Sequence, residues 1–192
     1  MRTTLVIILM FVSISINYSQ NSPEAFNSFK DFKIGMSEES LLKLHPEIIS
    51  DPTNNFCCYS SYSEIKTDYM NKYGIKELVL SSGDKISLKL GIYKGKLAII
   101  ILAYKNFQIF DDILNALQTK YGKYSNIEQN FYNDPLAGMN KTDVNVYWKN
   151  QNSILNFCYT SGVGLSHLIY ADNLVQKEIR SIKSKENLKK IN

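Results

Sequence analysis

The stretch that decides the fold is Lys85–Tyr104, KISLKLGIYKGKLAIIILAY. Its first half alternates apolar with polar or small residues, which is the period of a strand with one buried face. The tetrapeptide 93–96, Tyr-Lys-Gly-Lys, is typical of a tight hairpin turn. The second half, 97–104, is nearly all apolar, which indicates a strand buried on both faces. The stretch therefore predicts an antiparallel hairpin that leads into the centre of a sheet.

Three helices are predicted around this hairpin. Ser37 is a good N-cap for a short helix that ends near Leu44, before Pro46. A helical stripe of apolar residues predicts a second helix over 107–121. Asn173 is the expected N-cap of a third helix, with Gln176 placed to complete a capping box.

The order of these elements suggests two similar halves. Each half, about 33–105 and 106–172, starts with a helix and continues through several strands to a glycine-containing hairpin. Strand runs without long crossovers favour antiparallel pairing. We therefore predict an α+β protein whose antiparallel sheet consists of two tandem helix-then-meander halves. The helices should pack on one face, with a single domain over 20–172 and a C-terminal basic helix over 173–192.

The N-terminus has the pattern of a secretory signal peptide. Arg2 supplies a positive charge, and an apolar run of eight residues follows, too short to span a bilayer. Small polar residues come next, so cleavage is expected by about residue 19. This predicts an exported protein, periplasmic or secreted, without an integral membrane segment after cleavage.

Charge is distributed unevenly along the 192 residues. The chain has a formal net charge of +4, but the segment 173–192 alone holds six basic and two acidic residues. The body over 20–172 is close to neutral, which gives no support for nucleic-acid binding. The basic segment suits an acidic polymer of the cell envelope, or simply forms a solvated helix face.

A short motif resembles known envelope proteins. Gly35-Met36-Ser37, followed by Leu41, is similar to the helix start of small periplasmic proteins, including the small lipoprotein of the outer-membrane β-barrel assembly machine. The tandem helix-plus-meander plan resembles the β-lactamase inhibitor protein, whose sheet binds a partner. The chain lacks the cysteine that a bacterial lipoprotein would acylate near its cleavage site. The resemblance implies binding or scaffolding in the envelope.

The three cysteines suggest a disulfide, because an oxidising compartment preserves such bonds. Cys158 can pair with Cys57 or with Cys58, which would leave one thiol over. Alternatively, the cysteines are small core residues.

One candidate catalytic pair stands out. If 160–165 forms a tight hairpin turn, Cys158 and His167 face each other across two strands, with Cβ atoms about 5 Å apart. A cysteine beside a histidine can form a nucleophilic thiolate, so a small Cys–His hydrolase is one alternative. No nucleotide-binding or metal-binding motif is present, and we expect neither a cofactor nor a metal.

Tyrosine is the enriched residue type, with 13 in the chain. Tyrosine and tryptophan are favoured at interfaces, although aromatic side chains also suit strands. The candidate binding residues are Tyr104, Tyr147, Trp148, Tyr159 and Tyr170. We expect a binding protein that offers the helix-free face of its sheet to a protein or an envelope polymer, for instance as an inhibitor or immunity-type module. A structural envelope component is a further alternative.

Overall fold

The computed structural model describes residues 26–51, 65–79, 85–104, 110–134, 139–160 and 165–191. The predicted signal peptide over 1–19 and the cysteines Cys57 and Cys58 lie outside these ranges.

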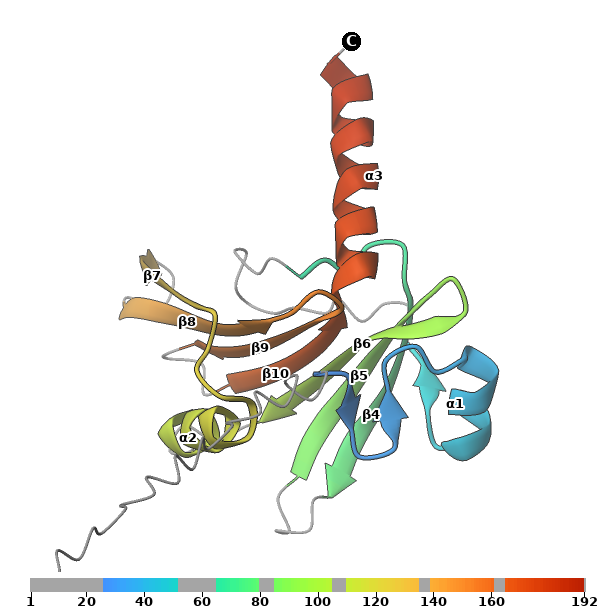
Figure 1. The fold of residues 1–192 in the computed structure, drawn as a ribbon, viewed down its shortest axis with the longest axis horizontal. Helices are drawn as coiled ribbons and strands as arrows, with labels where there is room; N and C mark the ends of the chain where they lie inside the picture. The colour runs from blue at the N-terminus through green and yellow to red at the C-terminus, as the bar shows by residue number, and fades with distance from the viewer. Residues whose placement is uncertain are drawn as a thin grey trace, which may run out of the picture.

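One large antiparallel sheet organises the molecule (Figure 1). Its eight strands lie in the order β3-β4-β5-β6-β10-β9-β8-β7. They are β3 (Ile49–Ser50), β4 (Asn71–Val79), β5 (Lys85–Tyr93), β6 (Lys96–Tyr104), β7 (Asn126–Asp134), β8 (Met139–Lys149), β9 (Ser153–Thr160) and β10 (Leu165–Asp172). Two short strands, β1 (Ser28–Phe29) and β2 (Phe32–Lys33), form a separate two-stranded sheet.

The strand order confirms the predicted α+β class and the two halves. Helix α1 (Glu38–Leu44) precedes β3–β6, and helix α2 (Phe110–Tyr121) precedes β7–β10. Within each half the strands follow one another in chain order, and the final strands, β6 and β10, pair antiparallel at the centre. The second half therefore repeats the first in mirrored order across the β6–β10 pair.

The central hairpin has the predicted geometry. Lys94 and Gly95 adopt φ angles of 49° and 73°, the left-handed conformation that a tight hairpin turn requires at its two central residues. Side chains from Leu97 to Leu102 are buried without interruption, as expected for a strand covered on both faces. Ser37 accepts a hydrogen bond from the Ser40 backbone N–H, which confirms it as the N-cap of α1.

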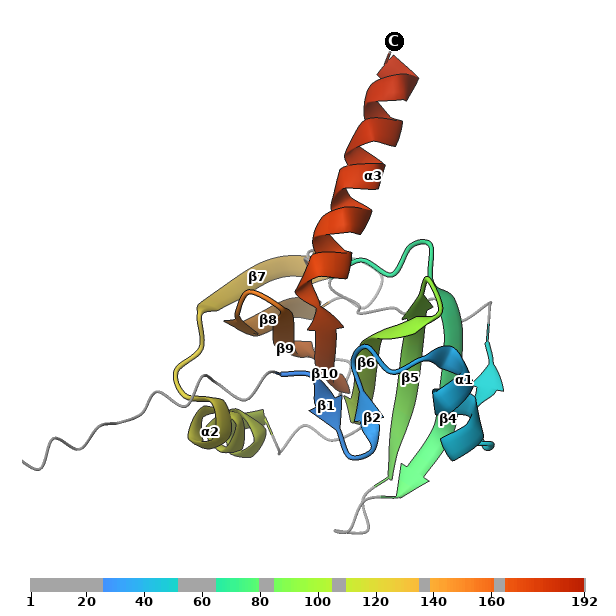
Figure 2. The ribbon, with the colours of Figure 1, turned by 45° about the vertical axis from the view of Figure 1, so that its right-hand side comes forward.

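The first face of the sheet, defined as the side that carries Leu88, Leu102 and Phe157, packs against α1 and α2. Leu41 of α1 and Leu117 of α2 join this core. Figure 2 shows α1 and the β1–β2 hairpin in front of the first-half strands.

The opposite side, the second face, is also buried over its central strands. It carries Ile99, Ile101, Tyr147, Cys158 and Ile169, and all five side chains are almost inaccessible to solvent. The expectation that the sheet leaves its helix-free face open is therefore wrong. The unbroken apolar run of β6 places isoleucines on both sides of the sheet, so neither side is stable in water.

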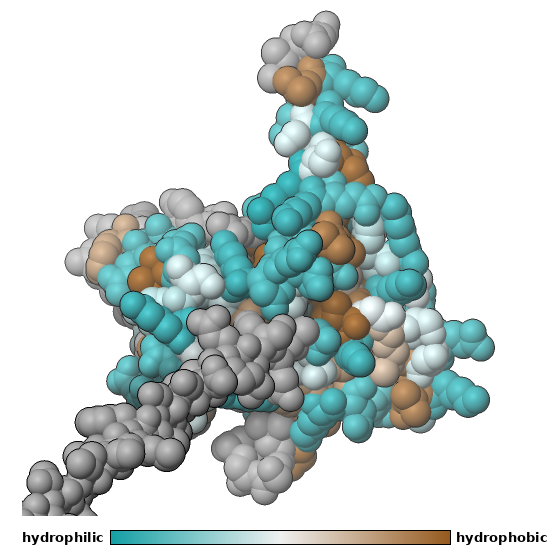
Figure 3. All heavy atoms as spheres, viewed as in Figure 1, coloured by the Kyte–Doolittle hydropathy of each residue, from teal (hydrophilic) through white to brown (hydrophobic). Residues whose placement is uncertain are grey.

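Helix α3 (Asn173–Ile191) begins on the second face and then projects from the body (Figures 1 and 2). Ile179, with Val175 beside it, joins the core of that face. Beyond Lys183 the helix is exposed on all sides, and its surface is mainly hydrophilic (Figure 3). Among the described segments, no helix is both long enough and apolar enough to cross a membrane.

The start of α3 corrects the capping prediction. The Asp172 carboxylate accepts hydrogen bonds from the backbone N–H groups of Leu174 and Val175, so Asp172 provides the cap. The Asn173 side chain instead donates to the carbonyl of Asn150, 2.8 Å away. Gln176 is fully buried, where it binds the backbone of Lys66 rather than closing a capping box.

Candidate functional site

Cys158 and His167 are direct register partners on β9 and β10. The predicted pairing is thus present in the structure, because the hairpin joins these strands without a register shift. The two side chains are only 1% and 5% exposed. A substrate that approaches from solvent would reach neither the Cys158 sulfur nor the His167 ring in this arrangement.

The electrostatic environment does not prime the pair for catalysis. Burial, together with the nearby positive charge of Lys89, lowers the pKa of His167 to about 4. The imidazole is therefore neutral at pH 7, whereas a thiolate–imidazolium pair needs a charged ring. Asn145 lies beside Cys158 on β8, and Ala103 lies beside His167 on β6. The direct cross-strand neighbours of the pair are therefore an amide and a methyl group, and neither is an acid that could orient the imidazole.

Cys158 is present as a buried thiol. Its candidate disulfide partners, Cys57 and Cys58, lie outside the described residues, so the disulfide stays a prediction. Among the residues that the structure describes, no group of three or more histidine, cysteine, aspartate or glutamate side chains is arranged to hold a metal ion.

Three of the five candidate aromatic binding residues belong to the interior. Tyr147, Trp148 and Tyr170 are buried, so they cannot form the exposed aromatic face expected from the sequence. The Trp148 indole donates a hydrogen bond of 2.8 Å to the carbonyl of Gly122, which ties β8 to the end of α2. Burial raises the pKa of the Tyr170 hydroxyl, consistent with a core position. The aromatic enrichment here reflects the size of a core that must cover a wide sheet.

The other two, Tyr104 and Tyr159, remain partly exposed and lie on one side of the sheet. Ser166 of β10 pairs with Tyr104 on β6 and with Tyr159 on β9, so the two tyrosines flank it. Tyr159 is in turn opposite Val144 on β8. These residues form a row on the first face that leads toward the edge strand β7.

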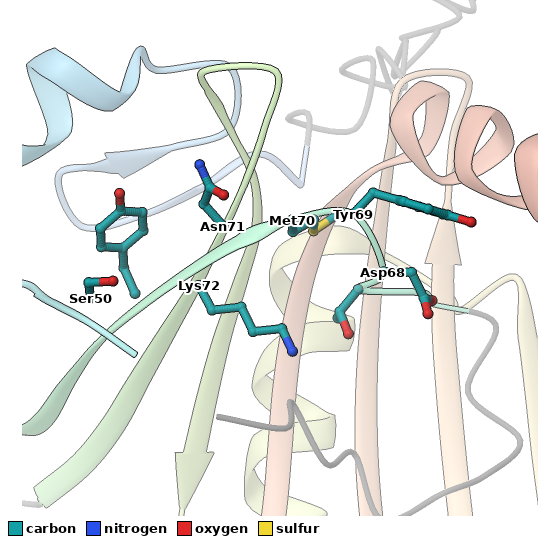
Figure 4. A pocket seen from close by; sticks show the side chains of 8 residues that line it. Ser50, Asp68, Tyr69, Met70, Asn71 and Lys72 are labelled. Carbon is teal, nitrogen blue, oxygen red and sulfur yellow. The ribbon is translucent and has the colours of Figure 1, made fainter. Parts of the chain in front are cut away.

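A polar hollow of about 470 Å³ lies where the chain enters β4 (Figure 4). Its lining comes from Ser50 and from residues 67–73. In Figure 4 the Tyr69 side chain extends away from this hollow toward α3. Its hydroxyl donates to the Glu186 carboxylate at 2.5 Å, which raises the pKa of Tyr69 to about 12.

Contacts beside this hollow and at the β5–β6 hairpin hold α3 in place. Asp68 forms an ion pair of 2.7 Å with Lys183, and Lys94 forms another of 2.7 Å with Glu178. Tyr69 adopts a φ of 62°, an uncommon conformation for a bulky residue, and this turns its ring toward the helix. The hollow is therefore best explained as the space beside the contacts of Asp68 and Tyr69 with α3, which connect the start of β4 to that helix.

The edge strand β7 is the feature that reasoning from aromatic content missed. Its nine residues pair with β8 along their full length, and β8 is its only partner among the described strands. Phe131 is 76% exposed and Ile127 is 41% exposed, and both lie on the first face. The alternation of Ile127, Gln129 and Phe131 is visible in the sequence, but only the strand order shows that it falls on an edge.

Comparisons of the chain with protein-family models, with curated proteins and with solved structures found no match.

Proposed function

We propose that the protein is an exported binding module that holds a protein partner along strand β7. The observation that carries the proposal is a nine-residue sheet edge bearing two exposed apolar side chains, Phe131 and Ile127. Export is supported by the signal-peptide pattern at the N-terminus.

An edge strand presents backbone N–H and C=O groups that have no partner on its outer side. Such an edge can accept an additional strand, which gains hydrogen bonds from the backbone and selectivity from the side chains. Native proteins usually protect long edges with lysine, proline or a bulge. The sequence of β7, NIEQNFYND, contains neither lysine nor proline, and its pairing with β8 shows no register shift.

The opposite edge of the sheet differs. There β3 covers β4 at Tyr73 and Gly74, and β4 carries a register shift between Ile75 and Leu78. This edge also contains Lys72 and Lys76. Cover, irregularity and positive charge all disfavour strand addition, so β7 is the better docking edge.

The rival hydrolase is supported less well. A catalytic cysteine needs access and an activating base, whereas Cys158 and His167 are both buried and the imidazole is held neutral. The basic end of α3 fits a structural role in the envelope, but its charge alone does not identify a partner.

The test compares the natural chain with an edge variant that carries Ile127→Lys and Phe131→Lys. Extended peptides selected from a display library for binding to the natural chain should lose at least about tenfold in affinity for this variant. Val79→Lys is the matched control, because Val79 is 55% exposed on β4 at the opposite edge. Binding should survive the control substitution.

Equal binding of the selected peptides to the edge variant would place the site elsewhere and reject the proposal. Hydrogen exchange gives a second readout, because an added strand should slow exchange of amides in 126–134. Slowing confined to 67–73 would point instead to the polar hollow.

A further inference from the structure

We infer that the strand that fits β7 is β7 of a second copy of this chain, paired antiparallel about a two-fold axis at Gln129. This inference rests on the proposed docking role of β7 and names its occupant. It would join two eight-stranded sheets into one continuous sheet.

The apolar residues of β7 are spaced symmetrically about one position, which favours pairing of the strand with itself. Ile127 and Phe131 lie two residues before and two residues after Gln129. Antiparallel pairing centred on Gln129 therefore sets Ile127 of each copy directly opposite Phe131 of the other. Directly opposed residues share a face, with Cβ atoms about 4.5–5.5 Å apart, and an aromatic side chain opposite a β-branched one is a favourable pair.

A two-fold contact must be complementary to itself, because the same patch serves both partners. The Gln129 register meets this condition, because it forms the same Ile127–Phe131 pair on both sides of the axis. Both exposed apolar side chains of each strand are then buried. A register centred on Asn130 would instead set Phe131 opposite Gln129. The apolar pairs would then be lost, so the pattern on β7 selects the first register.

The charges of β7 are compatible with self-pairing but weaken it. Glu128 would lie opposite Asn130 of the second copy, so no two carboxylates are directly opposed. The two Glu128 side chains are diagonal neighbours across the axis, about 7–8 Å apart at this spacing. In the single chain Asn126 donates a hydrogen bond of 3.0 Å to the Glu128 carboxylate. Added salt should therefore strengthen the association modestly, because it screens the carboxylates.

The size of the contact sets the expected strength. One strand pair buries less than the roughly 1,200–2,000 Å² of a standard stable interface. The dimer should therefore be reversible and depend on concentration, with a dissociation constant on the order of micromolar or weaker.

Sedimentation equilibrium of the mature chain is the primary test. The natural chain should pass from monomer to dimer as concentration rises, and Val79→Lys should behave in the same way. The Ile127→Lys and Phe131→Lys variant should stay monomeric at every concentration. Glu128→Gln should dimerise about twofold more tightly, because the diagonal repulsion is removed.

A single cysteine introduced at Gln129 tests the register, with Cys57 and Cys58 replaced by serine in all chains compared. Gln129→Cys should form an intermolecular disulfide under mild oxidation, because the two Cβ atoms face each other across the axis. Asn130→Cys is the matched control and should crosslink much less.

Stronger crosslinking at position 130 than at 129 would overturn the register. If the natural chain remains monomeric at the highest soluble concentration, the inference that a second copy pairs with β7 is wrong. That outcome is distinguishable from failure of the proposed function, because the peptide assay measures binding of a strand to β7 whether or not the chain dimerises.

Discussion

Cys158 and His167 lie directly opposite each other on β9 and β10, and both are sealed from solvent. This register brings a thiol next to an imidazole without making a reactive pair. Adjacency comes from strand pairing, whereas reactivity needs access and a charged or orienting neighbour. Here burial of the imidazole also lowers the pKa of His167, so the ring stays uncharged at neutral pH.

The buried His167 should make stability depend on pH. Its pKa is lowered to about 4 in the folded state from an ordinary value of 6.5, so the unfolded chain binds the proton more tightly. Stability should be fully present above pH 6.5, fall as the pH drops toward 4, and level off below that. The loss should be about 3 kcal/mol.

Urea unfolding at several pH values measures this effect. His167→Gln cannot titrate, so the difference between the natural chain and the variant isolates the contribution of His167. Parallel pH profiles for the natural chain and His167→Gln would contradict this prediction, because they would show that folding does not change the pKa of His167.

Cys158 should resist alkylation in the native protein. Because its thiol is buried, labelling by iodoacetamide should require unfolding and be slower than in urea by on the order of a thousandfold or more. Mass spectrometry of the peptide that contains residue 158 measures the rate. Rapid native labelling would reopen the hydrolase hypothesis, since it would reveal a reachable thiol.

Gln176 should be important for holding α3 on the sheet. Its side chain accepts from the Lys66 backbone N–H at 2.6 Å and donates to the Lys66 carbonyl at 2.9 Å. Gln176→Ala removes both bonds in a largely buried setting and should destabilise the protein by about 2–4 kcal/mol. Lys177→Ala, one position along and exposed, is the control and should change the free energy of unfolding by less than about 0.5 kcal/mol.

A loss in Gln176→Ala no larger than in the control would contradict this role. Circular dichroism adds a second readout, because release of α3 should let its end beyond Lys183, which few contacts support, lose helical structure and so reduce the total helical signal.

The buried Trp148 should report on the junction between β8 and α2. Trp148→Phe keeps an aromatic ring but leaves the Gly122 carbonyl without its indole donor. The expected cost is about 1–3 kcal/mol, from thermal or urea unfolding. Peptide binding at β7 should be unchanged in this variant, because Trp148 is a core residue and not a contact residue. Weakened binding in a fully folded Trp148→Phe chain would restore the original aromatic hypothesis.

Local patterns predicted much of the architecture. The alternation in β5, the apolar run in β6 and the hairpin at Lys94 and Gly95 were all readable, because each depends on neighbours a few residues apart. The Ser37 cap and the Cys158–His167 pairing were predictable for the same reason. The cap of α3 lies one residue before the predicted one, since both Asp172 and Asn173 are good N-caps and only the contact of Asn173 with Asn150 distinguishes them.

The binding candidates failed because burial is not a local property. Tyr147 and Trp148 are adjacent on β8 and point to opposite faces, yet both are buried because both faces of the sheet are covered. An aromatic residue has the same local sequence signal in a core as in an interface.

By itself, the sequence determined the elements, their order and the antiparallel hairpins, because backbone preference and hydrophobic period act over a few residues. Tertiary structure alone decided that β6 and β10 meet at the centre, that the second face is covered, and that β7 is left at the edge. These outcomes follow from pairing strands tens of residues apart in the chain. The apolar side chains of Ile127 and Phe131 acquire their proposed role from that position at the edge.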